Sequence, residues 1–275
     1  MISINRVKIS GWFLPLAALV WLSAAAQAEM YVEGYAGLGR AATVFPPFLP
    51  MATHHPLLGS YEEHHTRGTF DSAVIGGMKI GTWFTRQGFL RASYPEWLKY
   101  CGFYLDFNYH QQDFRRRDCF TLAVGPGGSE PTRNIFQSNG TAATLAFMFA
   151  GRYGFFGSKE VPFGRLQPYL GLGPAIIFTS QEVTLSSKSL SSSGLVPYTI
   201  RPGSDSATVI ALAIEPGLRW MVLKNVAIDL SFKFRWAHPS FTFRYRDPLD
   251  GTMESFRLNP TYLILSWQLG AAYHF

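Results

Sequence analysis

The last fifteen residues of the chain alternate in character and end on an aromatic residue. In residues 261–275 (TYLILSWQLGAAYHF), one parity carries large apolar side chains such as Leu265, Trp267 and Leu269, whereas the other carries Ser266 and Gln268. Successive side chains of a β-strand point to opposite faces, so the pattern predicts a strand with one apolar and one polar face. The apolar face is suited to lipid, and the polar face to an enclosed interior.

The composition restricts the fold class further. Aromatic residues make up 16% of the chain and charged residues 15%, which is aromatic-rich and charge-poor compared with a soluble domain. After residue 28, no segment approaches the roughly 20 continuous apolar residues of a transmembrane helix, so a helical membrane protein is excluded. Dispersed apolar residues and 26 glycines instead favour an all-β transmembrane barrel, with lipid-facing side chains on one parity and a polar lumen.

The first 28 residues have the composition of a signal peptide. Arg6 and Lys8 give a basic start, residues 11–26 are largely apolar, and residues 26–28 (AQA) form a small-residue cleavage pattern. We expect cleavage before Glu29, which leaves residues 29–275 as a single barrel domain. That domain is only mildly basic, so nucleic acid is not an expected partner.

Alternation and turn residues divide the remaining chain into candidate strands. The cleanest of them sets Phe103, Leu105 and Phe107 against Asp106 and Asn108. The set comprises eight segments, residues 30–40, 69–84, 101–109, 140–153, 165–179, 207–222, 226–236 and 261–275. The sequence therefore predicts an eight-stranded antiparallel transmembrane β-barrel.

The connections between these segments also alternate. Those at residues 41–68, 114–139, 180–206 and 237–260 are long and rich in Pro, Gly, Ser and charged residues, which is typical of extracellular loops. The other connections are shorter, and Lys224-Asn225 fits a tight hairpin turn. An even number of strands would place both ends of the barrel on the periplasmic side.

Charged residues recur on the parity opposite to the apolar face, and we expect them to face the lumen. An eight-stranded barrel leaves an interior just wide enough for side chains, so these charges favour a paired, structural network. A narrow conducting path is the alternative. The expected network comprises Lys79, Asp106, His110, Arg152, Glu215, Arg219, Asp229, Lys233 and Arg235.

The strand start at residues 165–174 (RLQPYLGLGP) resembles the motif of the OmpA-type and OmpX-type eight-stranded outer-membrane barrels. The resemblance implies the cell envelope of a Gram-negative bacterium, with outer-membrane lipid and lipopolysaccharide as partners. It also implies that Phe275 is the assembly signal read by the barrel-assembly machinery. The implied role is structural or a surface interaction through the loops, with an unknown ligand and no cofactor, because the motif is architectural rather than catalytic.

One enzymatic alternative rests on His238, Ser240 and Glu254. The segment His238-Pro239-Ser240 with a later glutamate resembles the lipid A 3-O-deacylases, in which histidine activates serine and glutamate orients the imidazole. Phe241 stands where that family carries asparagine, and a proline-terminated strand explains the same residues.

Three further groups of residues bear on lipid binding, metal binding and disulfide formation. Arg115, Arg116 and Arg117 follow the third strand, where guanidinium groups can contact lipid phosphates. The histidine pairs at residues 54–55 and 64–65 match no common zinc spacing, so no metal site is expected. The two cysteines, at positions 101 and 119, lie too far apart along a strand for a disulfide and are predicted to be free thiols.

Overall fold

A computed structural model describes residues 29–43, 61–62, 69–84, 95–125, 128–189, 198–246, 251 and 253–275. Residues 1–28, the predicted signal peptide, lie outside the described residues. The wall of the molecule consists of β1 (Glu29–Thr43), β3 (Thr69–Trp83), β4 (Cys101–Gln111), β6 (Gly128–Arg152), β7 (Leu166–Ser189), β8 (Tyr198–Met221), β9 (Val226–Ala237) and β12 (Tyr262–His274).

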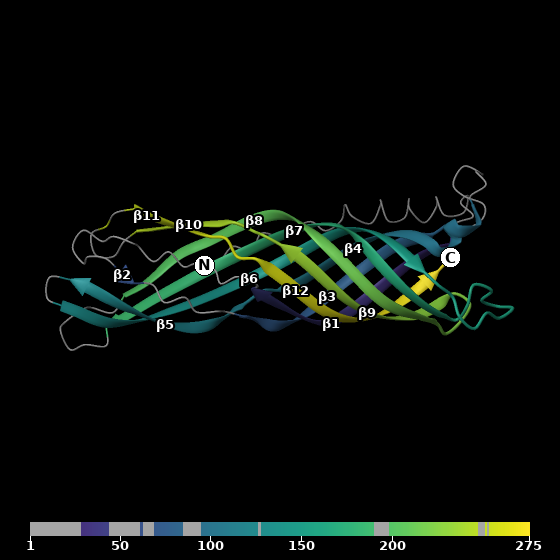
Figure 1. The fold of residues 1–275 in the computed structure, drawn as a ribbon, viewed down its shortest axis with the longest axis horizontal. Helices are drawn as coiled ribbons and strands as arrows, with labels where there is room; N and C mark the ends of the chain where they lie inside the picture. The colour runs from purple at the N-terminus through teal and green to yellow at the C-terminus, as the bar shows by residue number, and fades with distance from the viewer. Residues whose placement is uncertain are drawn as a thin grey trace, which may run out of the picture.

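These strands form a closed antiparallel barrel. Each is hydrogen-bonded to its neighbours in the order β1-β12-β9-β8-β7-β6-β4-β3, and β3 pairs with β1 to close the ring. The barrel is long, with β2, β5, β10 and β11 gathered toward one end and the C-terminus at the other (Figure 1). The eight-stranded prediction is confirmed, and five strands lie within a few residues of their expected bounds, whereas β6, β7 and β8 extend about ten residues further at one end.

The residues of the wall are sorted with charge inside and apolar surface outside. On β12, Trp267 and Leu269 are 62% and 60% exposed, whereas Ser266 and Gln268 are buried in the lumen. The same alternation runs along β4 and β9. A soluble protein buries its apolar face, so this inverted arrangement is the organisation of a transmembrane barrel.

Much of what the sequence predicted as long loops is β-structure, which corrects the expected loop bounds. β5 (Phe114–Gly125) continues beyond β4 and pairs with β6, and the short β2 (Tyr61–Glu62) pairs with β5. The β7–β8 ladder extends to Ser187↔Tyr198, and β10 (Phe241–Arg246) forms a hairpin with β11 (Met253–Leu258). Ladders of backbone hydrogen bonds hold these hairpins, so polar side chains and glycines do not prevent them.

The seam between β8 and β9 differs from its neighbours. Its ladder stops at Leu212↔Trp236, although β8 continues to Tyr198 with β7 as its partner. His238-Pro239-Ser240 lies outside any strand at this point, and proline has no N–H to donate to a ladder. Contact resumes higher up, where the Thr242 N–H donates to the Asp205 carboxylate at 2.6 Å.

The opposite end of the barrel has short turns. After Met221 the chain turns through residues 222–225, and the Asn225 side chain donates to the His274 carbonyl at 2.7 Å. The backbone N–H of His274 donates in return to the Asn225 carbonyl at 2.8 Å, which ties the turn to the last strand. A 3₁₀-helix, η4 (Glu96–Tyr100), precedes β4. Within the described residues, no helix is long and apolar enough to cross a membrane.

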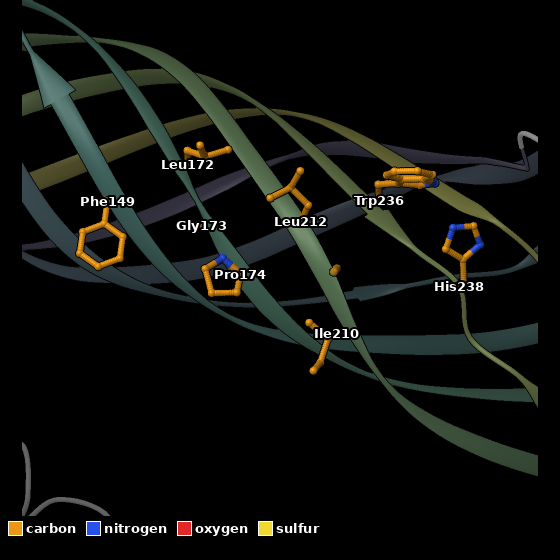
Figure 2. A pocket seen from close by; sticks show the side chains of 9 residues that line it. Phe149, Leu172, Gly173, Pro174, Ile210, Leu212, Trp236 and His238 are labelled. Carbon is orange, nitrogen blue, oxygen red and sulfur yellow. The ribbon is translucent and has the colours of Figure 1, made fainter.

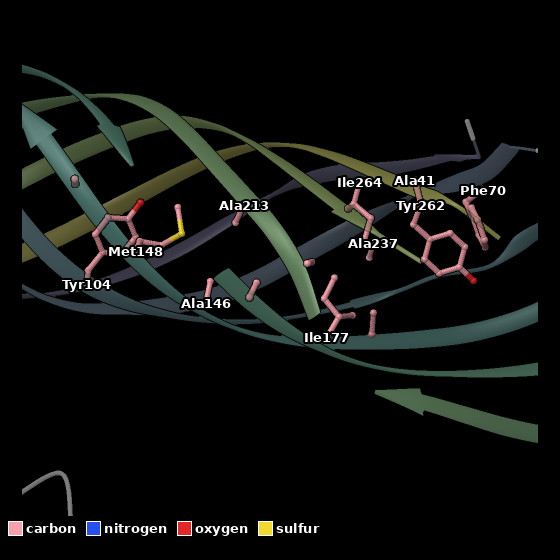
Figure 3. Close-up of a cluster of buried hydrophobic side chains, with 14 of the residues drawn as sticks. Ala41, Phe70, Tyr104, Ala146, Met148, Ile177, Ala213, Ala237, Tyr262 and Ile264 are labelled. Atoms are coloured by element: carbon pink, nitrogen blue, oxygen red, sulfur yellow. The ribbon is translucent and has the colours of Figure 1, made fainter. Parts of the chain in front are cut away.

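Apolar side chains fill the lumen above and below its charged middle. Tyr104 and Met148 lie toward one end of this buried cluster, and Phe70 and Tyr262 toward the other (Figure 3). Small residues such as Ala146 and Ala213 lie between them (Figure 3). Buried apolar side chains are therefore present on both sides of the charged middle of the lumen.

Candidate functional site

Lys79 on β3 is at the centre of a buried ion-pair network. Its Nζ lies 2.7 Å from Glu33 Oε1 on β1 and 2.7 Å from Glu215 Oε1 on β8, and all three side chains are essentially inaccessible. Asp229 on β9 is a third, longer partner at 3.8 Å. The ammonium group therefore links side chains from four strands of the wall.

Arg219 completes the same network from β8. Its Nη2 lies 2.5 Å from Glu33 Oε2, and its Nε lies 3.0 Å from Asp229 Oδ2. The guanidinium also stacks on the Tyr31 ring, with 4.2 Å between its central carbon and the ring centroid. Buried charges are tolerated when they are paired and hydrogen-bonded in this way.

A third cation, Lys233 on β9, joins the two sides of the lumen. It forms ion pairs with Asp106 on β4 and with Glu215 Oε2, the latter at 2.8 Å. The Tyr35 hydroxyl donates to Asp106 at 2.6 Å. The Tyr169 hydroxyl lies 2.9 Å from Glu215 and 2.8 Å from Asp229, so these two carboxylates share one phenol donor.

The end of the lumen near the C-terminus has its own ion pair. Arg152 donates to both carboxylate oxygens of Glu29, at 3.1 and 2.5 Å, and to Gln167 at 3.0 Å. The ring of His274 contacts the same carboxylate at 2.9 Å. The Arg152 guanidinium also stacks over the buried Trp83 ring, with 4.3 Å between its central carbon and the ring centroid.

All nine charged residues expected in the lumen are buried there, but two of them stand outside the network. His110 and Arg235 are buried in the layer above Asp106 and Lys233, and neither makes a hydrogen bond among the described residues. Conversely, the sequence interpretation missed Glu29 and Glu33, which complete the pairing. Both share the lumen-facing parity of β1 with Tyr31 and Tyr35, which is the signal that could have identified them.

His238 lies outside the lumen, on the lipid-facing wall. It lines a groove of about 710 Å³ with Trp236 of β9, Ile210 and Leu212 of β8, and Leu172 of β7 (Figure 2). Ala211, whose side chain belongs to the lumen-facing parity, lines the same groove. The groove therefore lies where the β8–β9 ladder stops and the two strands are no longer joined by backbone hydrogen bonds.

The structure does not bring the three residues of the possible esterase together. His238 Nδ1 is 2.9 Å from the Thr261 hydroxyl, which is its partner in place of Ser240. Glu254 pairs in register with Tyr245, five residues beyond Ser240 on β10. That separation corresponds to roughly 16 Å along a strand, too far for a glutamate to orient the imidazole.

The structure describes the remaining candidate binding residues only in part. Arg115, Arg116 and Arg117 lie in β5, but their side chains fall outside the described part of the chain. The histidines at positions 54–55 and 64–65 also lie outside it. Cys101 is a free thiol. It is opposite Gly151 of β6, whereas residue 119 is opposite Asn134, far along β6.

Together, a closed ring of eight strands, an apolar exterior and a charge-filled lumen define the class as a small transmembrane β-barrel. No protein-family model matches the chain, and no curated protein matches it significantly. Solved structures of similar architecture include the outer membrane protein OprG from Pseudomonas aeruginosa, with 14% identity, coverage of 91% of this chain and 97% of that chain, and a TM-score of 0.45.

Two other solved structures are comparable. A major outer membrane protein from Thermus thermophilus shares 14% identity over 90% of this chain and 100% of its own, with a TM-score of 0.43. Neisserial surface protein A shares 12% identity over 90% of this chain and 97% of its own, with a TM-score of 0.39. Identities and scores this low carry no conclusion about function.

Proposed function

We propose that this chain is an integral protein of the bacterial outer membrane with a structural or surface-interaction role. The apolar exterior of the barrel supports membrane insertion, because the closed ring satisfies the backbone hydrogen bonds that lipid cannot. Outer-membrane barrels of this size carry long strands and outer loops on one side, which agrees with the asymmetry of the two ends (Figure 1). Lipid and lipopolysaccharide are then its immediate surroundings.

One observation favours an interaction role over transport. The middle of the lumen is filled by Lys79, Arg219, Lys233 and their carboxylate partners, all of them essentially inaccessible to solvent. Since paired charges fill the narrow interior, the parts that remain free to meet other molecules are the β5–β6, β7–β8 and β10–β11 hairpins. We assign the interaction role to these hairpins.

Cysteine accessibility on intact cells tests the orientation and the exposed surface. In a variant without the native thiols, Ser204→Cys on the β7–β8 hairpin should react with a membrane-impermeant maleimide on intact cells. Lys224→Cys, in the turn at the opposite end, should react only after the outer membrane is permeabilised. Both side chains are exposed, so equal or reversed labelling would contradict the proposal.

Contact with lipid phosphate is a further part of the proposal. β5, which contains Arg115, Arg116 and Arg117, lies just beyond the apolar wall, where the phosphates of lipopolysaccharide would be found. Replacing all three by glutamine should weaken retention of lipopolysaccharide by the purified barrel. The folded state of the variant is verified by its altered gel mobility before boiling. Unchanged retention of lipopolysaccharide would then contradict the proposed phosphate contact.

A lipid esterase that uses His238 without Glu254 is the second candidate, and one observation favours it. His238 lines an apolar groove on the lipid-facing wall, where an acyl chain would pass beside its imidazole. Mass spectrometry of lipid A incubated with the folded protein and with His238→Ala decides the question. Loss of an acyl chain with the parent alone would establish the activity, and intact lipid A in both would exclude it.

A further inference from the structure

Four polar side chains directly above the ion-pair network are buried without a partner. Among the described residues, no hydrogen bond reaches the three guanidinium nitrogens of Arg235, both ring nitrogens of His110, both amide atoms of Asn108 or the Thr144 hydroxyl. Each of these side chains is at most a few per cent exposed. Buried polar groups in proteins are nearly always hydrogen-bonded, so this unpaired layer requires an explanation.

Arg235, Asn108 and Thr144 lie at about one level of the barrel, and His110 is the next lumen-facing residue above Asn108 on β4. Four antiparallel steps around the wall separate β4 from β9, so the two strands run in the same direction. Asp106 of β4 and Lys233 of β9 contact each other across the lumen, and Asn108 and Arg235 are the next residues on the same faces. Thr144 on β6 is opposite Asn108 in register, which brings it to the same level.

The neighbours of this layer in register are small or apolar. Ala142 is opposite His110, and Ala213 and Ile264 lie on either side of Arg235. None of these side chains can accept a hydrogen bond. The groups of the layer therefore face the lumen rather than a partner on the adjoining strand.

The pairing below leaves no carboxylate hydrogen-bonded to Arg235 among the described residues. Glu33, Asp106, Glu215 and Asp229 are all in direct contact with Lys79, Arg219 or Lys233. A guanidinium that is buried and lacks a counter-ion is strongly unfavourable. The guanidinium contributes five N–H donors to this layer. The amide of Asn108, the imidazole of His110 and the hydroxyl of Thr144 can each donate as well, so donors outnumber acceptors.

We propose that Arg235, with Asn108, His110 and Thr144, binds a small inorganic anion of the chloride class inside the barrel. The anion accepts hydrogen bonds from the guanidinium and the neighbouring donors and gives Arg235 a counter-ion in direct contact. Its size is limited because the layer is closed below by the ion pairs. Above it, Ser138 donates to Gln181 at 2.5 Å and Thr179 donates to Gln112 at 3.2 Å, which closes the lumen on that side.

An enclosed anion would enter while the barrel folds, and this determines the design of the test. The full mature chain is refolded in detergent in the presence of bromide and crystallised, and anomalous diffraction is measured at the bromine absorption edge. A bromide peak within hydrogen-bonding distance of the Arg235 guanidinium is the expected result. Density for water alone at that position would overturn the proposal.

A solution measurement gives a second, independent readout. The temperature at which the folded gel band is lost should be higher after refolding in chloride or bromide than in gluconate at equal ionic strength, since gluconate is too large for the layer. Arg235→Met should abolish this dependence on the anion, whereas Arg244→Met, an exposed arginine on β10, should preserve it. If Arg235→Met does not fold, the test rests on the parent protein refolded in the two salts. Equal unfolding temperatures of the parent in chloride and in gluconate would contradict the site.

Discussion

The two halves of the lumen are closed by different interactions. In the half nearer the C-terminus, Lys79, Arg219 and Lys233 are each in contact with at least two carboxylates. In the other half, Phe70 packs edge-on against Phe114 and Tyr262 with ring centroids 5.3 and 5.1 Å apart. The first half depends on complete pairing of charges, and the second on the filling of volume.

This difference determines how each half responds to damage. Removing one member of a buried ion pair leaves its partner charged and unsolvated, so the cost exceeds the value of the contact itself. Removing part of an aromatic side chain costs its burial and leaves a cavity, but it creates no unpaired charge. The charged half is therefore expected to be the more sensitive to single substitutions.

The largest expected effect is that of Glu215→Ala. Glu215 contacts Lys79 and Lys233, and its loss leaves two buried ammonium groups short of a partner. We expect a loss of about 3–5 kcal/mol in unfolding free energy, measured by urea titration of the barrel in lipid vesicles. Glu160→Ala, which removes an exposed carboxylate, is the control, and equal losses in the two variants would refute the distinction between buried and exposed pairs.

Phe136→Ala tests the aromatic half. Phe136 is buried and packs edge-on against Phe114, with ring centroids 5.3 Å apart. The same urea titration should show a loss of about 3 kcal/mol through the cavity that is formed. Phe178→Ala, on the lipid-facing wall, should cost less because lipid can fill the space. A larger loss for Phe178 would mean that the aromatic half is not tightly packed.

Tyr35→Phe separates hydrogen bonding from packing within the charged half. The substitution removes the hydroxyl that donates to Asp106 at 2.6 Å and keeps the ring beside Lys79. A hydrogen bond to a charged group contributes about 1.5–3 kcal/mol, and we expect a loss near the lower value because Lys233 remains paired with Asp106. Tyr109→Phe, at an exposed position, should be neutral, and a neutral Tyr35→Phe would place the stability of Asp106 entirely in its ion pair.

The smallest expected effect is that of Arg165→Gln at the turn end. Arg165 pairs with Glu160 at 2.9 Å, but both groups are substantially exposed. Exposed pairs contribute at most about 1 kcal/mol and are screened by salt. The change in unfolding free energy should fall below this value and shrink further at high ionic strength. A larger, salt-independent loss would indicate that the exposed end resembles the buried network.

The wall of the barrel could be predicted from the sequence because its signal is local. Trp267, Ser266 and Gln268 show the alternation that sorts side chains between lipid and lumen, and Lys224-Asn225 marks a turn. The same alternation assigned Lys79, Asp106 and Lys233 to the interior. A period of two residues is enough to determine a face.

The partners within the lumen and the hairpins beyond the wall could not be predicted in this way. The contact between Arg219 and Glu33 joins residues 186 positions apart, and only the closed ring brings them together. Phe70 shares its parity with the outward-facing Val74, but the register between β1 and β3 shifts near Arg40 and Phe70 is buried. In the hairpins the alternation is short: on β10, Phe241 and Phe243 are buried and Thr242 is exposed. The surrounding Pro, Gly, Ser and charged residues favoured a loop, so these strands were missed.

The closure of the ring has a consequence for how the protein folds. β1 and β12, the first and last strands, pair along their whole length, and Glu33 on β1 is the carboxylate that Lys79 and Arg219 share. Until the chain ends meet, every partial assembly has two unpaired edges and an incomplete set of charges. Such intermediates are unstable because of both the unpaired edges and the unpaired charges, so we expect the barrel to form in an all-or-none event. Its rate should be limited by the formation of the contacts that are most distant in the sequence.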